Sequence, residues 1–315
     1  MQKDVQDVVR ETLMPRIEVE ITHPDRVLFP GDGITTGDLV GYYNEIASRM
    51  LPHLKGRPLM VQRFPRGIGE QGFVQQDFDG ALPDWMSWIE VEKQGGTLMH
   101  PVADRPEAIV WLANQDCITP HMWLSQRGRL AHPDRLIFDL DPSGSADFTA
   151  VRATAYTLAE VLDGLGLVAY LQVTGSRGAH VVVPLDADAD FDTVRQFARD
   201  VADVVIADDP GQRTVEARKA RRGDRVYIDV MRNAYAQTAV APYAVRARPG
   251  APVATPIEWS ELDGASMRAD RFTIRDVAKR VADRGDPWTD LARHARSLSR
   301  PLDKLRRMSS TWRRS

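Results

Sequence analysis

Residues 135–142 read Arg-Leu-Ile-Phe-Asp-Leu-Asp-Pro, an apolar run typical of a buried strand that carries two acids, Asp139 and Asp141. Side chains alternate along a strand, so acids two residues apart share one face. Two like charges that close repel by roughly 1 kcal/mol in water and by more where water is scarce, so the pair favours a cation between the carboxylates. Oxygen ligands suit Mg²⁺ or Mn²⁺. The same pattern also fits a strand end that reaches solvent, with an aspartate capping the turn at residues 142–144.

A second strand-like run, residues 225–230, carries a third acid, Asp229. Its alternation puts Tyr227 and Asp229 on one face and the intervening aliphatic side chains on the other. If this strand lies beside the first, the three aspartates form a carboxylate site of the two-metal, phosphoryl-transfer type.

The segment between these runs reads as strand, turn, strand: residues 167–173, then Thr-Gly-Ser-Arg-Gly at 174–178, then residues 179–184. Glycines let backbone N–H groups approach an anion closely. Four side chains of this segment could donate hydrogen bonds to phosphate oxygens: Thr174, Ser176, Arg177 and His180. A five-residue turn with glycine is also an ordinary hairpin turn. The phosphate interpretation gains weight because an acid triad of this type acts on a polyanionic substrate.

Charge is unevenly distributed along the chain, whose net charge is only −3. The run 213–225 is basic and leads directly into the strand with Asp229, which favours a role at the site over a purely solvated loop. Residues 291–315 hold eight Lys or Arg against one Asp, so the rest of the chain carries about −10. Such a basic end is usually a solvated tail or a final helix, and nucleic-acid binding is the alternative.

Taken together, these motifs resemble the polymerase domain of bacterial DNA ligase D, a branch of the archaeo-eukaryotic primase superfamily. The matching segments occur in the family's order and spacing: Asp139-Leu140-Asp141-Pro142, residues 174–180, Tyr227-Ile228-Asp229 with Asn233 after it, and residues 241–246. The likeness runs from about residue 22 to about residue 308, nearly the whole chain.

The resemblance implies a template-dependent nucleotidyltransferase that adds ribo- or deoxyribonucleotides to DNA primers, gaps or broken ends by two-metal phosphoryl transfer. It assigns Asp139, Asp141 and Asp229 as catalytic residues that bind two divalent ions, Mn²⁺ or Mg²⁺. It assigns the nucleotide to these positions: His121, Thr174, Ser176, Arg177, Gly178, His180, Lys219, Arg222 and Arg246. It assigns DNA to a smaller set: Arg26, Arg63, Phe64 and Phe73. Read without the family, His121 would more often be a structural histidine.

The N-terminal part departs from the family pattern. Members that grip a 5′-phosphate at a break usually have lysine where this chain has Arg26, and a second lysine where it has Thr36. The aromatic platform for the template is usually Phe-Phe, whereas here Phe73 is followed by Val74. These departures predict weak recognition of a 5′-phosphate and leave the catalytic centre untouched.

The expected fold class is α+β, with helices over residues 39–54, 151–165 and 194–204 from their aliphatic stripes. Thr35 and Asp38 predict a capping box at the first of these helices. The resemblance adds two packed mixed or antiparallel sheets around a catalytic cleft, flanked by helices, one sheet resembling an RNA-recognition motif. It also implies a single primase-polymerase catalytic domain over residues 1–315.

Composition sets the cellular context. With 43% hydrophobic and 27% charged residues, the chain reads as an ordinary soluble protein. A single cysteine, Cys117, excludes an internal disulfide and fits a reducing cytoplasm. No membrane span or signal peptide is expected, so we predict a cytoplasmic, nucleoid-associated protein. A ligase domain does not fit in 315 residues, so the expected partners, besides DNA and an NTP or dNTP, are a separate DNA ligase and a Ku-type end-binding protein.

Two other functions fit parts of the sequence. A metal-dependent nuclease or phosphohydrolase also uses three aspartates and divalent ions, but it does not require the phosphate turn with His180. A DNA-end or repair-complex binding module that has lost activity is the non-enzymatic alternative. The intact acid triad argues against an inactive binding module, because a site without activity has no physical reason to keep three mutually repelling carboxylates.

Overall fold

Two sheets dominate the computed structural model, which describes residues 18–312 and the side chains as far as residue 307. The larger sheet has six strands, in the spatial order β11 (Arg213–Thr214), β12 (Val226–Asp229), β8 (Arg135–Pro142), β10 (Ala179–Pro184), β9 (Tyr170–Val173) and β14 (Thr255–Ile257). The smaller sheet has four, in the order β13 (Thr238–Val240), β7 (Cys117–Trp123), β3 (Leu59–Arg63) and β4 (Phe73–Gln75).

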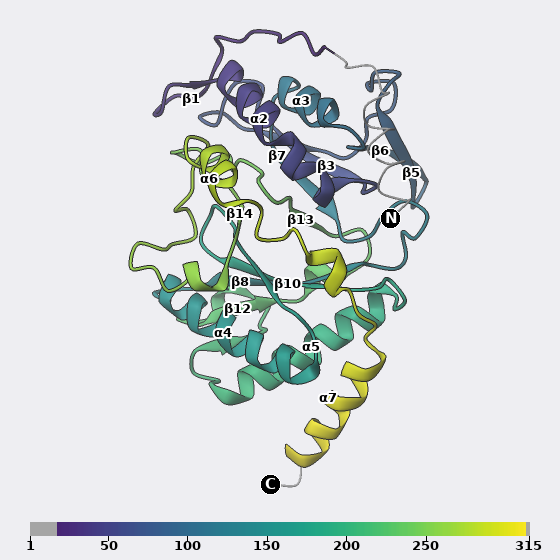
Figure 1. Ribbon diagram of the computed structural model, residues 1–315, viewed down its shortest axis with the longest axis vertical. Coiled ribbons are helices and arrows are strands. Elements are labelled where there is room, and N and C mark those ends of the chain that lie inside the picture. Colours follow the sequence, from purple (N-terminus) through teal and green to yellow (C-terminus); the bar gives the residue numbers. More distant parts are fainter. Residues whose placement is uncertain (1–17, 313–315) are drawn as a thin grey trace.

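The centre of the larger sheet has the chain order β8-α4-β9-β10-α5-β12, with α4 at Phe148–Leu165 and α5 at Phe191–Asp208. This strand–helix–strand–strand–helix–strand order, with β8 and β10 between β12 and β9, is that of an RNA-recognition-motif sheet, so this expectation is confirmed. Asp147 and Asp190 cap the helix starts, and Gly166 ends α4 in a left-handed conformation. Both helices cover one face of the sheet, as Figure 1 shows.

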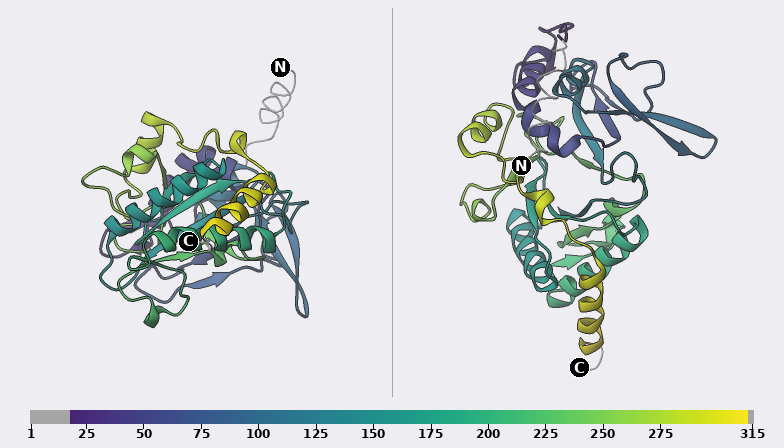
Figure 2. Two further views of the ribbon diagram at one scale, coloured as in Figure 1. Left: turned by 90° about the horizontal axis from the view of Figure 1, so that it is seen from below. Right: turned by 45° about the vertical axis from the view of Figure 1, so that its right-hand side comes forward.

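The smaller sheet is covered by α2 (Thr36–Leu54) and α3 (Pro106–Asn114), which pack against each other at the opposite end of the molecule (Figure 1). The capping box of Thr35 and Asp38 is present, and the aliphatic and tyrosine side chains of the expected stripe are buried. Two ribbons flank this half: β1 (Val27–Phe29) with β2 (Ile34–Thr35), and β5 (Ser87–Lys93) with β6 (Gly96–Val102). Figure 2 shows the β5–β6 ribbon standing out from the body.

The two sheets are joined just after the third aspartate. β12 belongs to the larger sheet and β13 to the smaller one, so residues 230–237 cross between them through η2 (Met231–Asn233). On the other side, the Tyr43 hydroxyl donates to Ile118 O at 2.7 Å and accepts from Val245 N at 3.0 Å. These contacts bind α2 and β7 of the smaller half to the segment that leads from β13 to β14 of the larger sheet.

The remaining elements are η1 (Lys219–Arg221), η3 (Trp259–Glu261), α6 (Val277–Arg284), η4 (Leu291–His294) and α7 (Ser299–Trp312). The basic C-terminal segment forms η4 and α7, and α7 packs against α4 and α5, on the helical side of the larger sheet. The strand expected at residues 167–173 starts later, at Tyr170, because residues 167–169 follow the helix end at Gly166 outside the ladder. Within residues 18–312, no helix is both long and apolar enough to cross a bilayer.

Candidate functional site

One row of side chains crosses the larger sheet. Asp229 pairs with Asp139, Asp139 with His180, and His180 with Gln172 on successive antiparallel strands. Residues directly opposite in antiparallel strands share a face, so these four side chains lie on one side of the sheet, with Asp141 two residues further along β8. The neighbourhood assumed from the sequence is confirmed.

This row faces the smaller sheet. Along β8, Phe138 and Leu140 point to the helical side and join the large apolar core, while Ile137 packs with Leu124 and Ala239 from the other half of the molecule. Asp139 has the same orientation as Ile137, because both are odd-numbered positions on one strand. The carboxylates therefore lie in the cleft between the two sheets.

Asp139 is the most strongly held carboxylate. His180 Nε2 lies 3.4 Å from one oxygen and Arg232 Nε donates to the other at 3.1 Å. Burial alone would raise the pKa of Asp139, but His180 and Arg232 outweigh burial and lower it to about 2. Asp141 behaves oppositely, since burial and then the charge of Asp139 raise its pKa. The site thus contains one firmly ionised carboxylate beside another whose charge is unfavourable.

Arg232 lies between the acids. Its Nε is 3.1 Å from Asp139 and 3.8 Å from Asp229, and it comes from the segment that crosses between the sheets. Asn233 fixes that segment, since it accepts from Ile137 N at 2.9 Å and donates to Ile137 O at 2.7 Å. Sequence reasoning missed Arg232. The signal available in the sequence was a basic residue three positions after Asp229 and next to Asn233, which belongs to the family motif.

The phosphate turn is tightly built. The Thr174 hydroxyl donates to Gly178 O at 3.0 Å and accepts from Gly178 N at 3.3 Å. A side chain cannot fit at Gly178, because a Cβ there would lie 1.8 Å from Leu140 O. The turn therefore touches the backbone of the strand that carries the two aspartates, and its position relative to them is fixed.

Cations surround this turn. Arg177 donates to Pro142 O at 2.8 Å, and Arg246 donates to Thr174 O at 2.8 Å. Ser176 comes directly before Arg177 on the turn itself and is half-buried. Donors gathered around a turn of this kind match the needs of a polyphosphate.

His121 comes from β7 of the smaller sheet. Burial and then the charge of Arg246 lower its pKa to about 3, so the imidazole is neutral at pH 7. Its Nδ1 is buried, with no hydrogen-bond partner among the described residues. The Gln172 amide is also buried without a partner in that part of the chain, and sequence reasoning missed it. Such unsatisfied groups are costly unless a ligand uses them.

The basic run before β12 divides into two parts. Arg213 is structural, since it donates to Val205 O at 2.9 Å and pairs with Asp208 at 2.8 Å on α5. Arg222 lies over the ring of Tyr227 at 3.6 Å, which brings it next to the acid row. Lys219 is exposed at the start of η1.

The candidate DNA contacts lie near β3 and β4. Arg63 donates to Gln115 O at 2.6 Å and stacks 5.5 Å from the Phe73 ring centre, and Phe73 is 48% exposed. Phe64 is half-buried against the core. Arg26 forms an ion pair with Asp116. Thr36 is fully buried, so a side chain at that position is not presented on the surface.

The carboxylates fit divalent ions by their chemistry. Within residues 18–312, no group of three or more His, Cys, Asp or Glu side chains is gathered closely enough to bind a metal as it stands. The Arg232 guanidinium lies between Asp139 and Asp229, where it is the positive group beside these carboxylates. The three aspartates nevertheless offer only oxygen donors, and burial and then the charge of Asp139 raise the pKa of Asp141, an effect that a bound cation would counteract.

Comparisons with known proteins agree with this geometry. Residues 35–288 match the model of the LigD primase-polymerase domain. The chain is 32% identical over 281 residues to the multifunctional non-homologous end joining protein LigD of Mycolicibacterium smegmatis, covering 88% of this chain and 36% of that protein. It is 28% identical to the bifunctional LigD of Bacillus subtilis, covering 96% of this chain and 49% of that protein. The chain thus spans from about a third to half the length of these relatives.

A solved structure gives the same result. The polymerase domain from Mycobacterium tuberculosis ligase D in complex with DNA superposes with a TM-score of 0.83 at 29% identity, covering 89% of this chain and all of that one. The α+β fold with two packed sheets is therefore confirmed. From the matched residues and the shared fold, this chain belongs to the LigD primase-polymerase domain family.

Proposed function

We propose that the protein is a template-dependent nucleotidyltransferase that adds ribo- or deoxyribonucleotides to DNA primers, gaps or ends. One observation carries the proposal. Asp229, Asp139 and His180 lie in one register across three strands, and the phosphate turn touches the backbone of the central one. A site with acids beside a built polyphosphate turn has the parts that nucleotide addition needs.

Each group has a distinct role in this reaction. The triphosphate lies on the turn, where Arg177 and His180 donate to its oxygens, while Thr174 and Gly178 hold the turn in shape through their hydrogen bonds to each other. Neutral His121 adds a hydrogen bond rather than a charge. The 3′-oxygen of the primer forms a bond to the α-phosphorus, and the bond to pyrophosphate breaks.

Further cations support the leaving group. Arg246 donates to the turn from the segment that follows β13, and Ser176, Arg222 and Lys219 complete the donor set from the turn and from the basic run. Positive charge gathered where pyrophosphate departs stabilises the charge that develops in the transition state.

Asp139, Asp141 and Asp229 would hold two divalent ions, Mn²⁺ or Mg²⁺. When bound, such ions activate the attacking oxygen and neutralise charge on the phosphates. Arg232 must then move from between Asp139 and Asp229 toward the phosphates, which its 39% exposed side chain allows.

Primer–template DNA would lie along β3 and β4, where Phe73 offers one exposed ring for stacking and Arg63 a nearby cation. Phe64 and Arg26 support this surface from partly buried positions. We place the activity in DNA repair by end joining, gap filling or priming, as a single catalytic domain over residues 1–315. A DNA ligase activity and a Ku-type protein would act with it on DNA in the nucleoid.

Primer extension tests the proposal. The purified protein is given a labelled primer on gapped, recessed and unprimed templates, with each nucleotide type and with Mn²⁺ or Mg²⁺. We expect extension that is lost in Asp139→Asn. Asp286→Asn is the matched control, since both carboxylates are 9% exposed and ion-paired, but Asp286 pairs with His53 away from the acid row. Extension by the Asp139 variant, or none by the wild-type protein on any template, would refute the proposal.

A further inference from the structure

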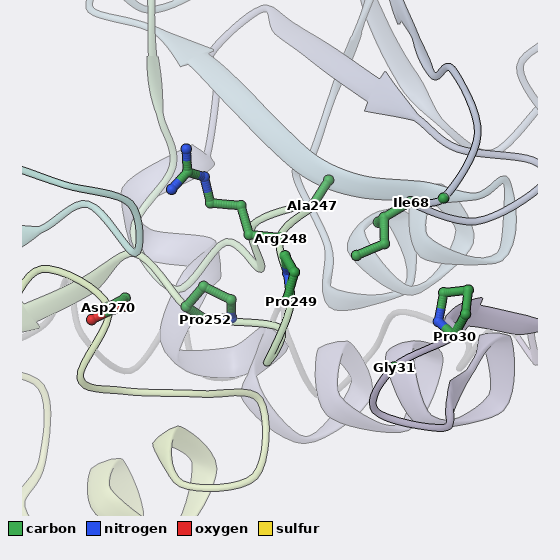
Figure 3. Close-up of a pocket in the computed structure, with 9 residues that line it drawn as sticks. Pro30, Gly31, Ile68, Ala247, Arg248, Pro249, Pro252 and Asp270 are labelled. Atoms are coloured by element: carbon green, nitrogen blue, oxygen red, sulfur yellow. The ribbon is translucent and has the colours of Figure 1, made fainter.

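A cavity of about 690 Å³ lies outside the acid row, on the far side of the phosphate turn. It opens between the β1–β2 turn, the loop from β3 to β4, and the segment after Arg246. Figure 3 shows Pro30 and Ile68 on one side, Ala247, Pro249 and Pro252 on the other, and Arg248 and Asp270 toward the end farther from Pro30. Its volume is within the range of sites for small ligands.

The walls of this cavity are fixed to one another. The β1–β2 turn is bound on the opposite wall by Asp32, whose carboxylate accepts from Gly250 N at 2.8 Å and whose carbonyl accepts from Arg275 at 3.0 Å. The β3–β4 loop approaches β1 so closely that Ile68 N donates to Leu28 O at 2.8 Å. Hydrogen bonds across a cavity keep it open without a ligand, which reduces the ordering cost of binding.

The lining combines flat apolar surface with one available cation. Pro30, Pro249, Pro252 and Ile68 present rings and a branched side chain, which suit the face of a nucleobase. Arg248 is exposed, and its guanidinium forms no hydrogen bond or ion pair with any residue the structure describes. The acid of the lining, Asp270, is neutralised by Arg268 at 2.6 Å.

The walls of the cavity adjoin the phosphate turn of the proposed reaction centre. Arg248 lies two residues after Arg246, which donates to Thr174 O in the phosphate turn. Ala269 O, beside Asp270, accepts from Gly175 N of the same turn at 2.9 Å. On its other side the cavity is bounded by the loop that leads into the strand of Phe73. It therefore lies between the turn for the incoming nucleotide and the stacking platform.

We propose that this cavity binds one nucleotide unit of the single-stranded template, with its base against the proline and isoleucine walls and its phosphate on Arg248. The inference rests on the proposed function and deepens it. The template is the occupant because the triphosphate already has donors around the turn, on the side of the acid row. A template strand that continues past the templating base would reach a subsite between the phosphate turn and the exposed Phe73 ring.

Arg248→Ala and Gly69→Leu test this subsite. The first removes the cation. The second fills the cavity without distorting the loop, since a Cβ at Gly69 meets only the Pro30 ring at an ordinary 3.8 Å. Fluorescence anisotropy measures binding of two DNAs that share a duplex, one blunt and one with a single-stranded 5′ template extension. Arg195→Ala, on α5, is the control because Arg195 is an arginine with a 38% exposed side chain on the helical side of the sheet.

We expect each cavity variant to lose about fivefold or more in affinity for the extended DNA and to keep its affinity for the blunt duplex. Arg248→Ala should also reduce the slope of log affinity against log salt by about 0.7, the contribution of one phosphate on a single strand. Unchanged binding, or an equal loss with blunt DNA, refutes the subsite. The subsite is also refuted if the cavity variants raise the nucleotide KM but keep their affinity for the extended DNA, because the occupant is then the free nucleotide.

The two proposals can fail separately. If the wild-type protein prefers the extended DNA and Arg248→Ala abolishes that preference, the subsite stands even where no primer is extended. If primers are extended but the cavity variants behave like the control, the subsite is wrong and the proposed function stands.

Discussion

Arg232→Gln should destabilise the protein in the absence of divalent ions and increase the stabilisation that Mn²⁺ provides. The guanidinium is the cation nearest to Asp139 and Asp229, at 3.1 and 3.8 Å. Without it, two carboxylates that are 9% and 15% exposed lose their positive neighbour. A metal ion then fills the same position without displacing a competitor.

The magnitude follows from distance and exposure. Unit charges about 4 Å apart attract by about 4 kcal/mol near a protein surface. Solvent at a side chain that is 39% exposed, together with its desolvation cost, reduces this to a net loss of about 2 kcal/mol in unfolding free energy. We expect Mn²⁺ to stabilise the variant by at least about 1 kcal/mol more than the wild type, since the ion no longer displaces the guanidinium.

Urea denaturation with and without saturating Mn²⁺ measures both effects. Arg195→Gln is a close control, because Arg195 is 38% exposed and pairs with Asp192 at 2.8 Å, but that aspartate is 84% exposed. This control should lose less than about 0.5 kcal/mol. Equal stability of the two variants, or equal stabilisation of Arg232→Gln and wild type by Mn²⁺, would show that Arg232 does not hold the place of a metal ion.

Three further changes test other parts of the site. Because the pKa of His121 is about 3 in the folded protein and near 6.5 when unfolded, the unfolded chain binds more protons between these values, so stability falls as pH is lowered. His121→Gln should remove about 2 kcal/mol of the loss between pH 7 and pH 5, while His23→Gln, at an exposed position, should change little. Gln172→Leu should raise the unfolding free energy by about 1 kcal/mol or more, and a lower stability in calorimetry would mean that the amide has a partner. His180→Ala should raise the nucleotide KM roughly tenfold to a hundredfold in steady-state kinetics without affecting DNA affinity, and a weaker gel shift with KM unchanged would assign His180 to DNA.

Local pattern predicted the elements that position the acids. The alternation at residues 135–142 and 225–230 gives β8 and β12, and their pairing brings Asp229 opposite Asp139. The helices over residues 151–165 and 194–204 are α4 and α5, slightly longer at their ends because the capping aspartates lie outside the aliphatic stripes. The strands and helices themselves depend on neighbours in sequence and were predictable, whereas the pairing of β8 with β12 joins distant residues and was an assumption.

Features that depend on distant contacts were not predictable. Gln172 looks like one polar residue in a strand, and only the register with His180 places it in the acid row. Arg232 resembles any cation in a loop until the crossing between sheets brings it to Asp139. Arg213 belongs to a basic run, yet its contacts to α5 make it structural. In each case the deciding partner is tens of residues away or on another element.

Gly178 has a consequence for how mutations would be tolerated across the site. A saturation library should show no accepted replacement there, since even alanine would collide with Leu140 O. At Gly128, by contrast, nothing lies near an added Cβ, and only its backbone φ of +83° restricts the choice. Loss of function at Gly178 would therefore arise because the phosphate turn is displaced from β8, while every reactive side chain is still present. A screen that measures activity alone would wrongly assign Gly178 a role in the chemistry.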